Sequence, residues 1–176
     1  MPKIAIVDKM HQEGINLLKN NPKFECEIIE DLSKKNLMSK LPAFDGITLR
    51  RGKIDSEILE KCKKLKVISR HGVGYDNVDL NYLNKEKIAL AITGSANAVT
   101  VAEHVMAMFL ILSKFIRTSD QHVRKGKFNL RDSIQNNMLE LYKKNIFIIG
   151  FGRIGKTLAK RCIGFESKVF VYDPYL

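Results

Sequence analysis

Six consecutive residues, Gly150-Phe151-Gly152-Arg153-Ile154-Gly155, have the types and spacing needed to bind a diphosphate. In a G-x-G-x-x-G turn the first glycine permits a tight turn, the second lets the backbone approach a pyrophosphate, and the third lets the following helix pack on the strand. The N–H groups and partial positive charge of the helix N-terminus then attract the anion. An apolar run at 146–149 and a helix-like stretch at 156–161 flank the turn, so the motif stands in the context that this chemistry requires.

An acidic residue, Asp173, ends a second apolar run at 168–172 and lies 18 residues after Gly155. A dinucleotide fold places a ribose-binding carboxylate about twenty residues after the turn. Such a carboxylate also repels a 2′-phosphate, so the pattern favours NAD over NADP. The predicted cofactor site comprises Gly150, Gly152, Arg153, Ile154, Gly155 and Asp173. The alternative is that the glycines form a tight strand–helix turn and nothing more.

A second candidate site is the segment Arg70-His71-Gly72-Val73-Gly74-Tyr75-Asp76-Asn77-Val78-Asp79, which follows a predicted strand. Glycines on both sides of Val73 let successive backbone N–H groups converge on an anion such as a carboxylate. Open α/β sheets also bind ligands at the end of the sheet where this segment is expected. The alternative is a glycine-rich turn followed by an Asn or Asp helix cap.

The elements that must position these residues alternate regularly. Short apolar runs predict strands at 3–7, 24–29, 46–49, 66–69 and 88–92, and amphipathic stretches predict helices at 11–19, 33–41, 56–65 and 80–86. Strands separated by single helices predict right-handed crossovers and a mostly parallel sheet. The fold class is therefore α/β: a flavodoxin-like domain over 1–98, followed over 99–176 by a linking helix and the first βαβ unit of a Rossmann domain, which is incomplete.

The linking helix is predicted from a capping box, Thr100-Val101-Ala102-Glu103, and is expected to run to about residue 126. Its early turns are apolar nearly all round, which predicts burial between layers. The polar stretch 127–137 is expected to be a loop. The apolar runs 146–149 and 169–172 predict parallel strands buried on both faces. One crossover helix cannot cover both faces, so we expect the protein to be a fragment.

The segments 70–79 and 150–155, with the link 97–104 between them, resemble the D-isomer-specific 2-hydroxyacid dehydrogenases, and within that family the D-3-phosphoglycerate dehydrogenase branch. The resemblance implies that the N–H groups of Val73 and Gly74 bind the substrate carboxylate and that Arg50 approaches the substrate. It also implies that Thr100 lies near the nicotinamide and that Arg153 and Ile154 contact the diphosphate. The alternative for Arg50 is that Arg50 and Arg51 are two solvated loop charges.

The same resemblance implies that the catalytic Arg, Glu and His of the family lie beyond Leu176, so no catalytic residue is predicted here and these 176 residues alone are expected to be inactive. None of the histidines in this sequence lies in a motif that would let it take over the role of the catalytic His. His71 flanks the predicted anion loop, His104 lies inside the linking helix beside Glu103, and His11 and His122 have no partner motif. No metal-ligand spacing appears in the sequence.

The formal net charge of +11 raises the possibility of an anionic partner. The lysines are scattered, however, and the sequence has neither a zinc pattern nor a run of five or six basic residues, so no specific nucleic acid is predicted. Three widely spaced cysteines, Cys26, Cys62 and Cys162, suggest reduced thiols and a cytoplasmic location. No membrane partner is expected, because the uncharged stretch 105–113 is about half of a bilayer span.

These observations predict the N-terminal part of an NAD-dependent oxidoreductase that interconverts a D-2-hydroxy acid and its 2-keto acid by hydride transfer, with 3-phosphoglycerate as one candidate substrate. The resemblance implies a homodimer for the full-length parent. Two alternatives remain open. One is a non-catalytic NAD-responsive regulatory protein, and the other is a weak, unspecific nucleic-acid binder.

Overall fold

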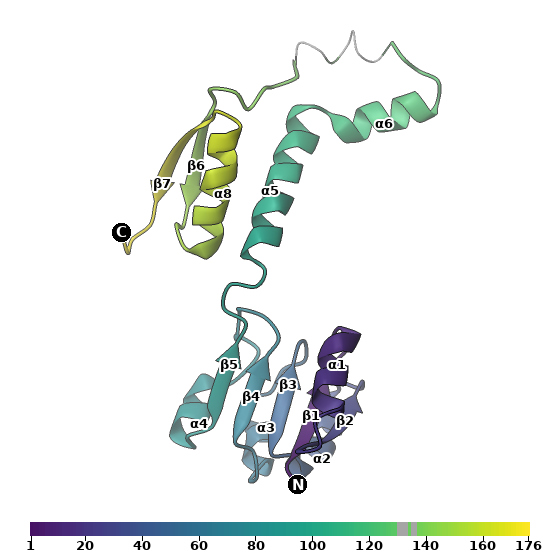
Figure 1. Ribbon diagram of the computed structural model, residues 1–176, viewed down its shortest axis with the longest axis vertical. Helices are drawn as coiled ribbons and strands as arrows, with labels where there is room; N and C mark the ends of the chain where they lie inside the picture. The colour runs from purple at the N-terminus through teal and green to yellow at the C-terminus, as the bar shows by residue number, and fades with distance from the viewer. Residues whose placement is uncertain (130–133, 135–136) are drawn as a thin grey trace. The chain divides into compact units, whose positions relative to one another are not determined.

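The strand–helix alternation expected from the sequence is present in the computed structural model of the protein, which describes residues 1–129, 134 and 137–176 (Figure 1). The protein divides into two compact units, Met1–Gly94 and Ser95–Leu176. We call them unit 1 and unit 2. The division falls slightly before the boundary at 98/99 that the sequence suggested.

Unit 1 is built on a five-stranded parallel sheet with the strand order β2-β1-β3-β4-β5. Its strands are β1 (Lys3–Val7), β2 (Glu25–Ile29), β3 (Gly46–Leu49), β4 (Val67–Arg70) and β5 (Ala89–Ile92). Its helices are α1 (Gln12–Lys19), α2 (Lys34–Lys40), the short 3-10 helix η1 (Leu41–Ala43), α3 (Ser56–Lys61) and α4 (Leu80–Lys85). The predicted flavodoxin-like parallel sheet is confirmed, because this order is the flavodoxin order.

Side chains alternate between the two faces of the sheet, as the pleat of a strand requires. Ala5 and Val7 of β1 belong to the main core cluster with Leu37 of α2, Ile58 of α3 and Leu83 of α4. Ile6, between them in β1, is also fully buried but lies outside that cluster, so side chains on both faces of β1 are covered. The parallel order brings the carboxyl ends of all five strands to one edge of the sheet.

The described residues of unit 2 include a βαβ unit and the helices that precede it: α5 (Ala98–Ser113), α6 (Ile116–Arg124), β6 (Asn145–Ile149), α8 (Arg153–Gly164) and β7 (Lys168–Tyr172). Strands β6 and β7 pair in parallel, and α8 connects them. The core of this unit joins Ala102 and Met106 of α5 to Ile146 and Ile148 of β6 and to Leu158 of α8. The predicted βαβ unit is therefore present with its glycine turn between β6 and α8.

The predicted capping box is wrong. Helix α5 begins at Ala98 after Asn97, whose side chain makes no capping hydrogen bond, so Thr100 lies inside the first turn. The carboxylate of Glu103 instead accepts a hydrogen bond from Arg161 of α8 at 2.8 Å. The packing of α5 against α8 gives this carboxylate a cationic partner, and the local sequence carries no sign of that partner.

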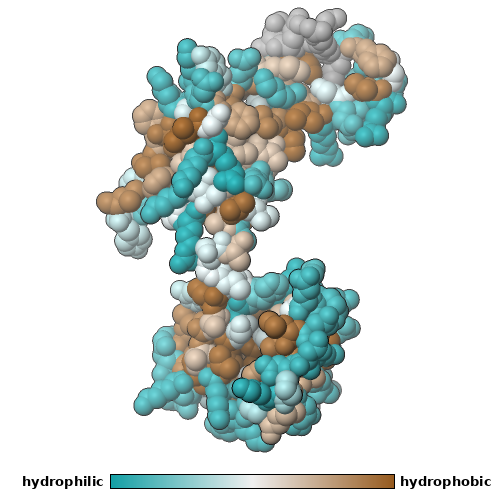
Figure 2. Space-filling model, in the orientation of Figure 1, coloured by the Kyte–Doolittle hydropathy of each residue, from teal (hydrophilic) through white to brown (hydrophobic). Residues whose placement is uncertain are grey.

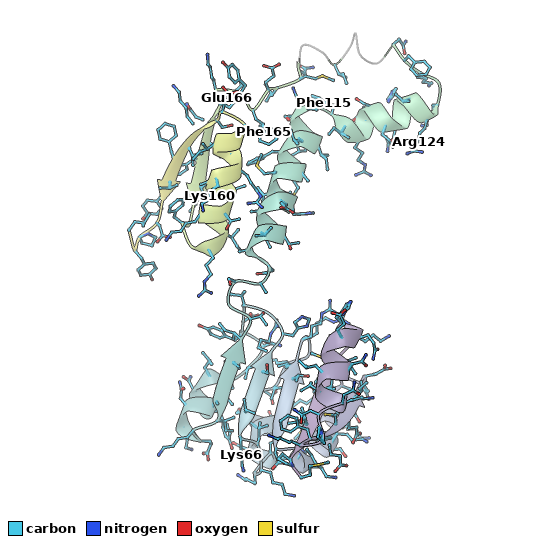
Figure 3. All side chains as sticks on the ribbon, in the orientation of Figure 1. Lys66, Phe115, Arg124, Lys160, Phe165 and Glu166 are labelled. Carbon is cyan, nitrogen blue, oxygen red and sulfur yellow. The ribbon has the colours of Figure 1, made fainter. Side chains whose placement is uncertain are left out.

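The predicted extent of the linking helix is also wrong. Helix α5 ends at Ser113, and Phe115 adopts a left-handed conformation with φ 49° at the corner before α6 (Figure 3). The axes of α5 and α6 differ in direction by 62°. A non-glycine residue in this conformation is uncommon, and neither Gly nor Pro marks the break in the sequence. The loop expected at 127–137 lies largely outside the described residues.

The predicted burial of the linking helix is wrong as well. Helix α5 buries only Ala98, Ala102, Met106 and Ser113, and its Leu112 is 70% exposed. In β6 only alternate residues are buried, while Phe147 and Ile149 are exposed, because α5 and α8 cover one face of the β6–β7 pair. Among the described residues the second face is uncovered, as expected from the sequence for strands joined by one crossover helix. Brown and tan apolar residues therefore reach the surface of this unit (Figure 2).

The apolar character of α5 raises the question of a membrane span. In the part of the sequence that the structure describes, no single helix is both long and apolar enough to cross a bilayer. Helices α5 and α6 meet the length and composition requirement only jointly, as a pair with a sharp bend between them.

Candidate functional site: a glycine turn and an anion loop

The glycine turn, residues 150–155, joins the end of β6 to the start of α8. Gly150 has φ +91°, a conformation that favours glycine, and its N–H donates to the carbonyl oxygen of Tyr172 at the end of β7 at 2.7 Å. A Cβ on Gly155 would overlap the carbonyl oxygen of Gly150 and would lie 3.5 Å from the side chain of Ile148. These two glycines let the helix start directly against the strand.

Gly152 precedes the first helical residue of α8 and contributes no capping side chain. A Cβ placed on Gly152 would have no other atom within 4 Å, so the backbone here borders open space. Arg153 and Ile154 form the first turn of α8, and both side chains are exposed. The N–H groups in the first turn of an α-helix have no acceptor within the helix, so this end of α8 favours an anion.

The carboxylate of Asp173 lies directly beside this turn. Its Oδ2 accepts a hydrogen bond from the N–H of Phe151 at 2.6 Å, and its Oδ1 accepts one from the N–H of Tyr175 at 3.0 Å. These hydrogen bonds, that of Tyr175 foremost, lower the pKa of Asp173, so the group is ionised near neutral pH. The structure thus brings together the glycine turn and the acid that the sequence singled out as one site.

The second candidate site, the anion loop at residues 70–79, follows β4 at the carboxyl edge of the unit 1 sheet. The carbonyl oxygen of Gly72 accepts from the N–H of Thr93 at 3.1 Å, and that of Tyr75 accepts from the N–H of Val78 at 3.0 Å. Val73 and Gly74 are exposed, and their N–H groups have no hydrogen-bond acceptor among the residues that the structure describes. The loop therefore presents two adjacent donors to an incoming anion.

Arg50 lies at the same edge of the sheet, directly after β3. Arg50 and the anion loop share this edge because β3 and β4 are neighbouring strands. Leu49 of β3 pairs with Arg70 of β4, and the carbonyl oxygen of Leu49 accepts from the N–H of His71 at 2.8 Å. The guanidinium of Arg50, however, donates to the carbonyl oxygen of Lys9 at 3.3 Å. The structure thus places Arg50 near the anion loop in the fold, with its side chain hydrogen-bonded toward the end of β1.

Sequence reasoning missed a charged pair at this edge. Asp8 directly follows β1 and is only 4% exposed, and its carboxylate accepts from Arg51 at 2.7 Å (Nε to Oδ2) and 3.0 Å (Nη2 to Oδ1). This two-point hydrogen bond lowers the pKa of Asp8 to about 2, against the opposing effect of burial. The sequence signal for this pair was an acidic residue directly after the first strand, but its partner, Arg51, lies 43 residues further along the chain.

Sequence reasoning also missed Asn77, whose side chain makes hydrogen bonds to both Arg70 and Gly52.

The histidines lie as follows. His71 and His104 are exposed, His11 accepts from the N–H of Glu13 as the cap of α1, and Nδ1 of His122 lies 2.9 Å from the carbonyl oxygen of Thr118.

No group of three or more His, Cys, Asp or Glu side chains is arranged to hold a metal ion within the described ranges. Burial raises the pKa of the Cys62 thiol to about 11, which leaves that thiol protonated near neutral pH.

Curated relatives resemble the protein over almost all of its length. It is 31% identical over 175 residues to a D-3-phosphoglycerate dehydrogenase of Archaeoglobus fulgidus, covering 99% of this chain and 32% of that protein. It is 32% identical over 173 residues to a hydroxypyruvate reductase of Thermotoga maritima, covering 98% of this chain and 55% of that protein. The protein thus spans about one third to one half of the length of these relatives.

Solved structures give the same result. An NAD-dependent formate dehydrogenase from Staphylococcus aureus in complex with NAD matches with a TM-score of 0.85 at 28% identity, covering 98% of this chain and 56% of that one. A 3-phosphoglycerate dehydrogenase of Entamoeba histolytica with bound NAD+ matches with a TM-score of 0.79 at 27% identity, covering 99% and 55%. The family model of the D-isomer specific 2-hydroxyacid dehydrogenase catalytic domain matches residues 4–166. This chain, with its flavodoxin-like sheet and its glycine turn, therefore belongs to the D-isomer-specific 2-hydroxyacid dehydrogenase family.

Proposed function

We propose that this chain provides the substrate-carboxylate loop and the diphosphate-binding turn of an NAD-dependent dehydrogenase that interconverts a D-2-hydroxy acid and its 2-keto acid. The observation that carries the proposal is the 2.6 Å hydrogen bond between the Phe151 N–H and Asp173, which joins the glycine turn to the acid. A dinucleotide-binding unit needs both features at adjacent strand ends.

The cofactor site would consist of the glycine turn and Asp173. The first turn of α8, with Arg153 and Ile154, would face the diphosphate, and Gly152 would leave room for its approach. Asp173 would accept hydrogen bonds from the adenosine ribose, and its negative charge would disfavour a 2′-phosphate, so NAD is preferred over NADP. NAD would supply the hydride acceptor. Thr100 stays a predicted contact of the nicotinamide.

The substrate site would consist of the anion loop and its neighbours. The two N–H donors of Val73 and Gly74 favour a carboxylate as their ligand, and the positive charge of Arg50 at the same edge favours an acidic substrate. Several relatives are named D-3-phosphoglycerate dehydrogenase, and others are named hydroxypyruvate reductase or glyoxylate reductase. The shared class is a small 2-hydroxy or 2-keto acid, with 3-phosphoglycerate as one candidate.

The predicted inactivity of these 176 residues alone and the homodimer of a longer parent both stay predictions. A non-catalytic, NAD-responsive protein would use the same cofactor turn. It would differ from a dehydrogenase in failing to oxidise NADH with small 2-keto acids even as part of a longer polypeptide.

Gly152→Ala is expected to weaken NADH binding by about tenfold or more while the protein stays folded. The new methyl group meets no protein atom, but it would occupy the space through which a diphosphate approaches the backbone. Titration of the protein with NADH, followed by nicotinamide fluorescence, measures the dissociation constant.

Gly164→Ala is the matched control, because it makes the same substitution at the other end of α8, also with no atom within 4 Å of the new Cβ. The control should bind NADH as tightly as the unmodified protein. Equal affinity of both variants for NADH would contradict the cofactor site.

A further inference from the structure

We propose that Asn77 is a positioning residue that holds Arg70 and the loop after β3 in place for anion binding by Val73 and Gly74. The proposal rests on the substrate site described above. The side chain of Asn77 makes no hydrogen bond to either candidate donor within the described residues, so its role would be to fix their surroundings.

The side chain of Asn77 joins two loops that follow neighbouring strands. Its Oδ1 accepts from Nε of Arg70 at 3.2 Å, and its Nδ2 donates to the carbonyl oxygen of Gly52 at 2.7 Å. The orientation of the amide follows from chemistry, because a guanidinium can only donate and a carbonyl can only accept. The backbone oxygen of Asn77 also accepts from the N–H of Ile54 at 2.9 Å. Asn77 thereby ties the segment after β3 to the anion loop through two bonds, to Gly52 and Ile54, and holds Arg70 within the loop through a third.

Arg70 is held at a second point inside the anion loop. Its Nη1 donates to the carbonyl oxygen of His71, and its guanidinium fills the space that a side chain on Gly72 would need. The guanidinium of Arg70 therefore lies against the backbone that leads into Val73 and Gly74. A fixed positive charge beside two N–H donors strengthens their attraction for a carboxylate.

No other residue type of similar size makes both side-chain bonds of Asn77. An aspartate would keep the acceptor for Arg70 but would set a carboxylate oxygen against the carbonyl of Gly52, and a leucine would lose both bonds. Loss of the amide would remove one of the two hydrogen bonds that hold the guanidinium of Arg70 and the side-chain bond to the carbonyl oxygen of Gly52.

The test uses 15N-labelled protein and D-glycerate, a small D-2-hydroxy acid, as the probe. In the unmodified protein, D-glycerate should shift the amide signals of Val73 and Gly74, and the Nε–H signal of Arg70 should exchange slowly with water. Asn77→Leu should speed that exchange and weaken D-glycerate binding by about tenfold, as expected for the loss of a hydrogen bond to a charged group. Asn84→Leu is the matched control, because Asn84 is exposed on α4 in the same unit and its side chain makes no hydrogen bond within the described residues.

Unchanged Arg70 exchange and unchanged affinity in Asn77→Leu would overturn the positioning role, as would equal effects in Asn84→Leu. If D-glycerate shifts no signal of the unmodified protein, the proposed substrate site fails, and Arg70 exchange still decides whether Asn77 positions the guanidinium. If Asn77→Leu does not fold, Asn77→Asp replaces it. That variant should keep the Arg70 exchange slow and shift the amide signal of Lys53, which follows the Gly52 carbonyl, and an unshifted Lys53 signal would overturn the proposal.

Discussion

Gly155→Ala is expected to destabilise unit 2 by several kcal/mol, a large part of the roughly 5–15 kcal/mol that stabilises an ordinary domain. The added methyl group would overlap the carbonyl oxygen of Gly150, which is backbone and cannot rotate away as the end of a flexible side group could. Relief would require α8 to separate from β6, and that separation would disrupt the buried contacts of Ile148 and Leu158. Urea denaturation followed by the amide signals of β6 and α8 measures the loss.

Gly164→Ala is again the control, and it is expected to stabilise unit 2 rather than to destabilise it. An alanine in a helix is about 1 kcal/mol more favourable than a glycine, and nothing obstructs a Cβ at this position. The described geometry of the turn would be contradicted if Gly155→Ala left the stability of unit 2 within about 0.5 kcal/mol of the unmodified value.

The second large effect is a dependence of unit 1 stability on pH through Asp8. Its folded-state pKa of about 2 lies below the ordinary value of 3.8, so the folded state binds this proton less readily than the unfolded state. The stability from this group is therefore fully present above about pH 5 and is lost as the pH falls through about 2. The contribution is about 2 kcal/mol by linkage. Unfolding in urea at pH 7, 5, 3.5 and 2 measures it.

Arg51→Met should remove this contribution at pH 7, because it leaves the nearly buried carboxylate of Asp8 without its cation. Lys40→Met is the matched control, because Lys40 pairs with Glu27 at 2.9 Å but both side chains are about half exposed. An exposed pair contributes about 0–1 kcal/mol, so this variant should change little. Equal losses in the two variants, or a loss in Arg51→Met that persists unchanged at pH 2, would refute the role of the Asp8 pair.

The sequence was sufficient to predict features that depend on residues close together along the polypeptide. The glycine turn and Asp173 could be joined because a βαβ unit of this length brings adjacent strand ends together, as the bond to Phe151 shows. The parallel sheet of unit 1 followed from the alternation of strands with single helices, which leaves few topologies open.

Features that depend on contacts between distant segments could not be predicted in this way. The Asp8–Arg51 pair and the Glu103–Arg161 pair each join separate elements, and single charged residues give no sign of their partners. The left-handed conformation of Phe115 had no glycine to mark it. The capping box around Thr100 was misleading, because the same residue types are compatible with the middle of a helical turn.

Whether the glycine turn and Asp173 form one cofactor site is tested by mapping NAD binding on the amide signals of the 176-residue protein. NAD is expected to cause saturable shifts at Phe151, Gly152, Ile154 and Asp173, and NADP is expected to bind more weakly, because the carboxylate repels a 2′-phosphate. Shifts confined to other parts of the protein, or NADP bound as tightly as NAD through these residues, would contradict this cofactor site.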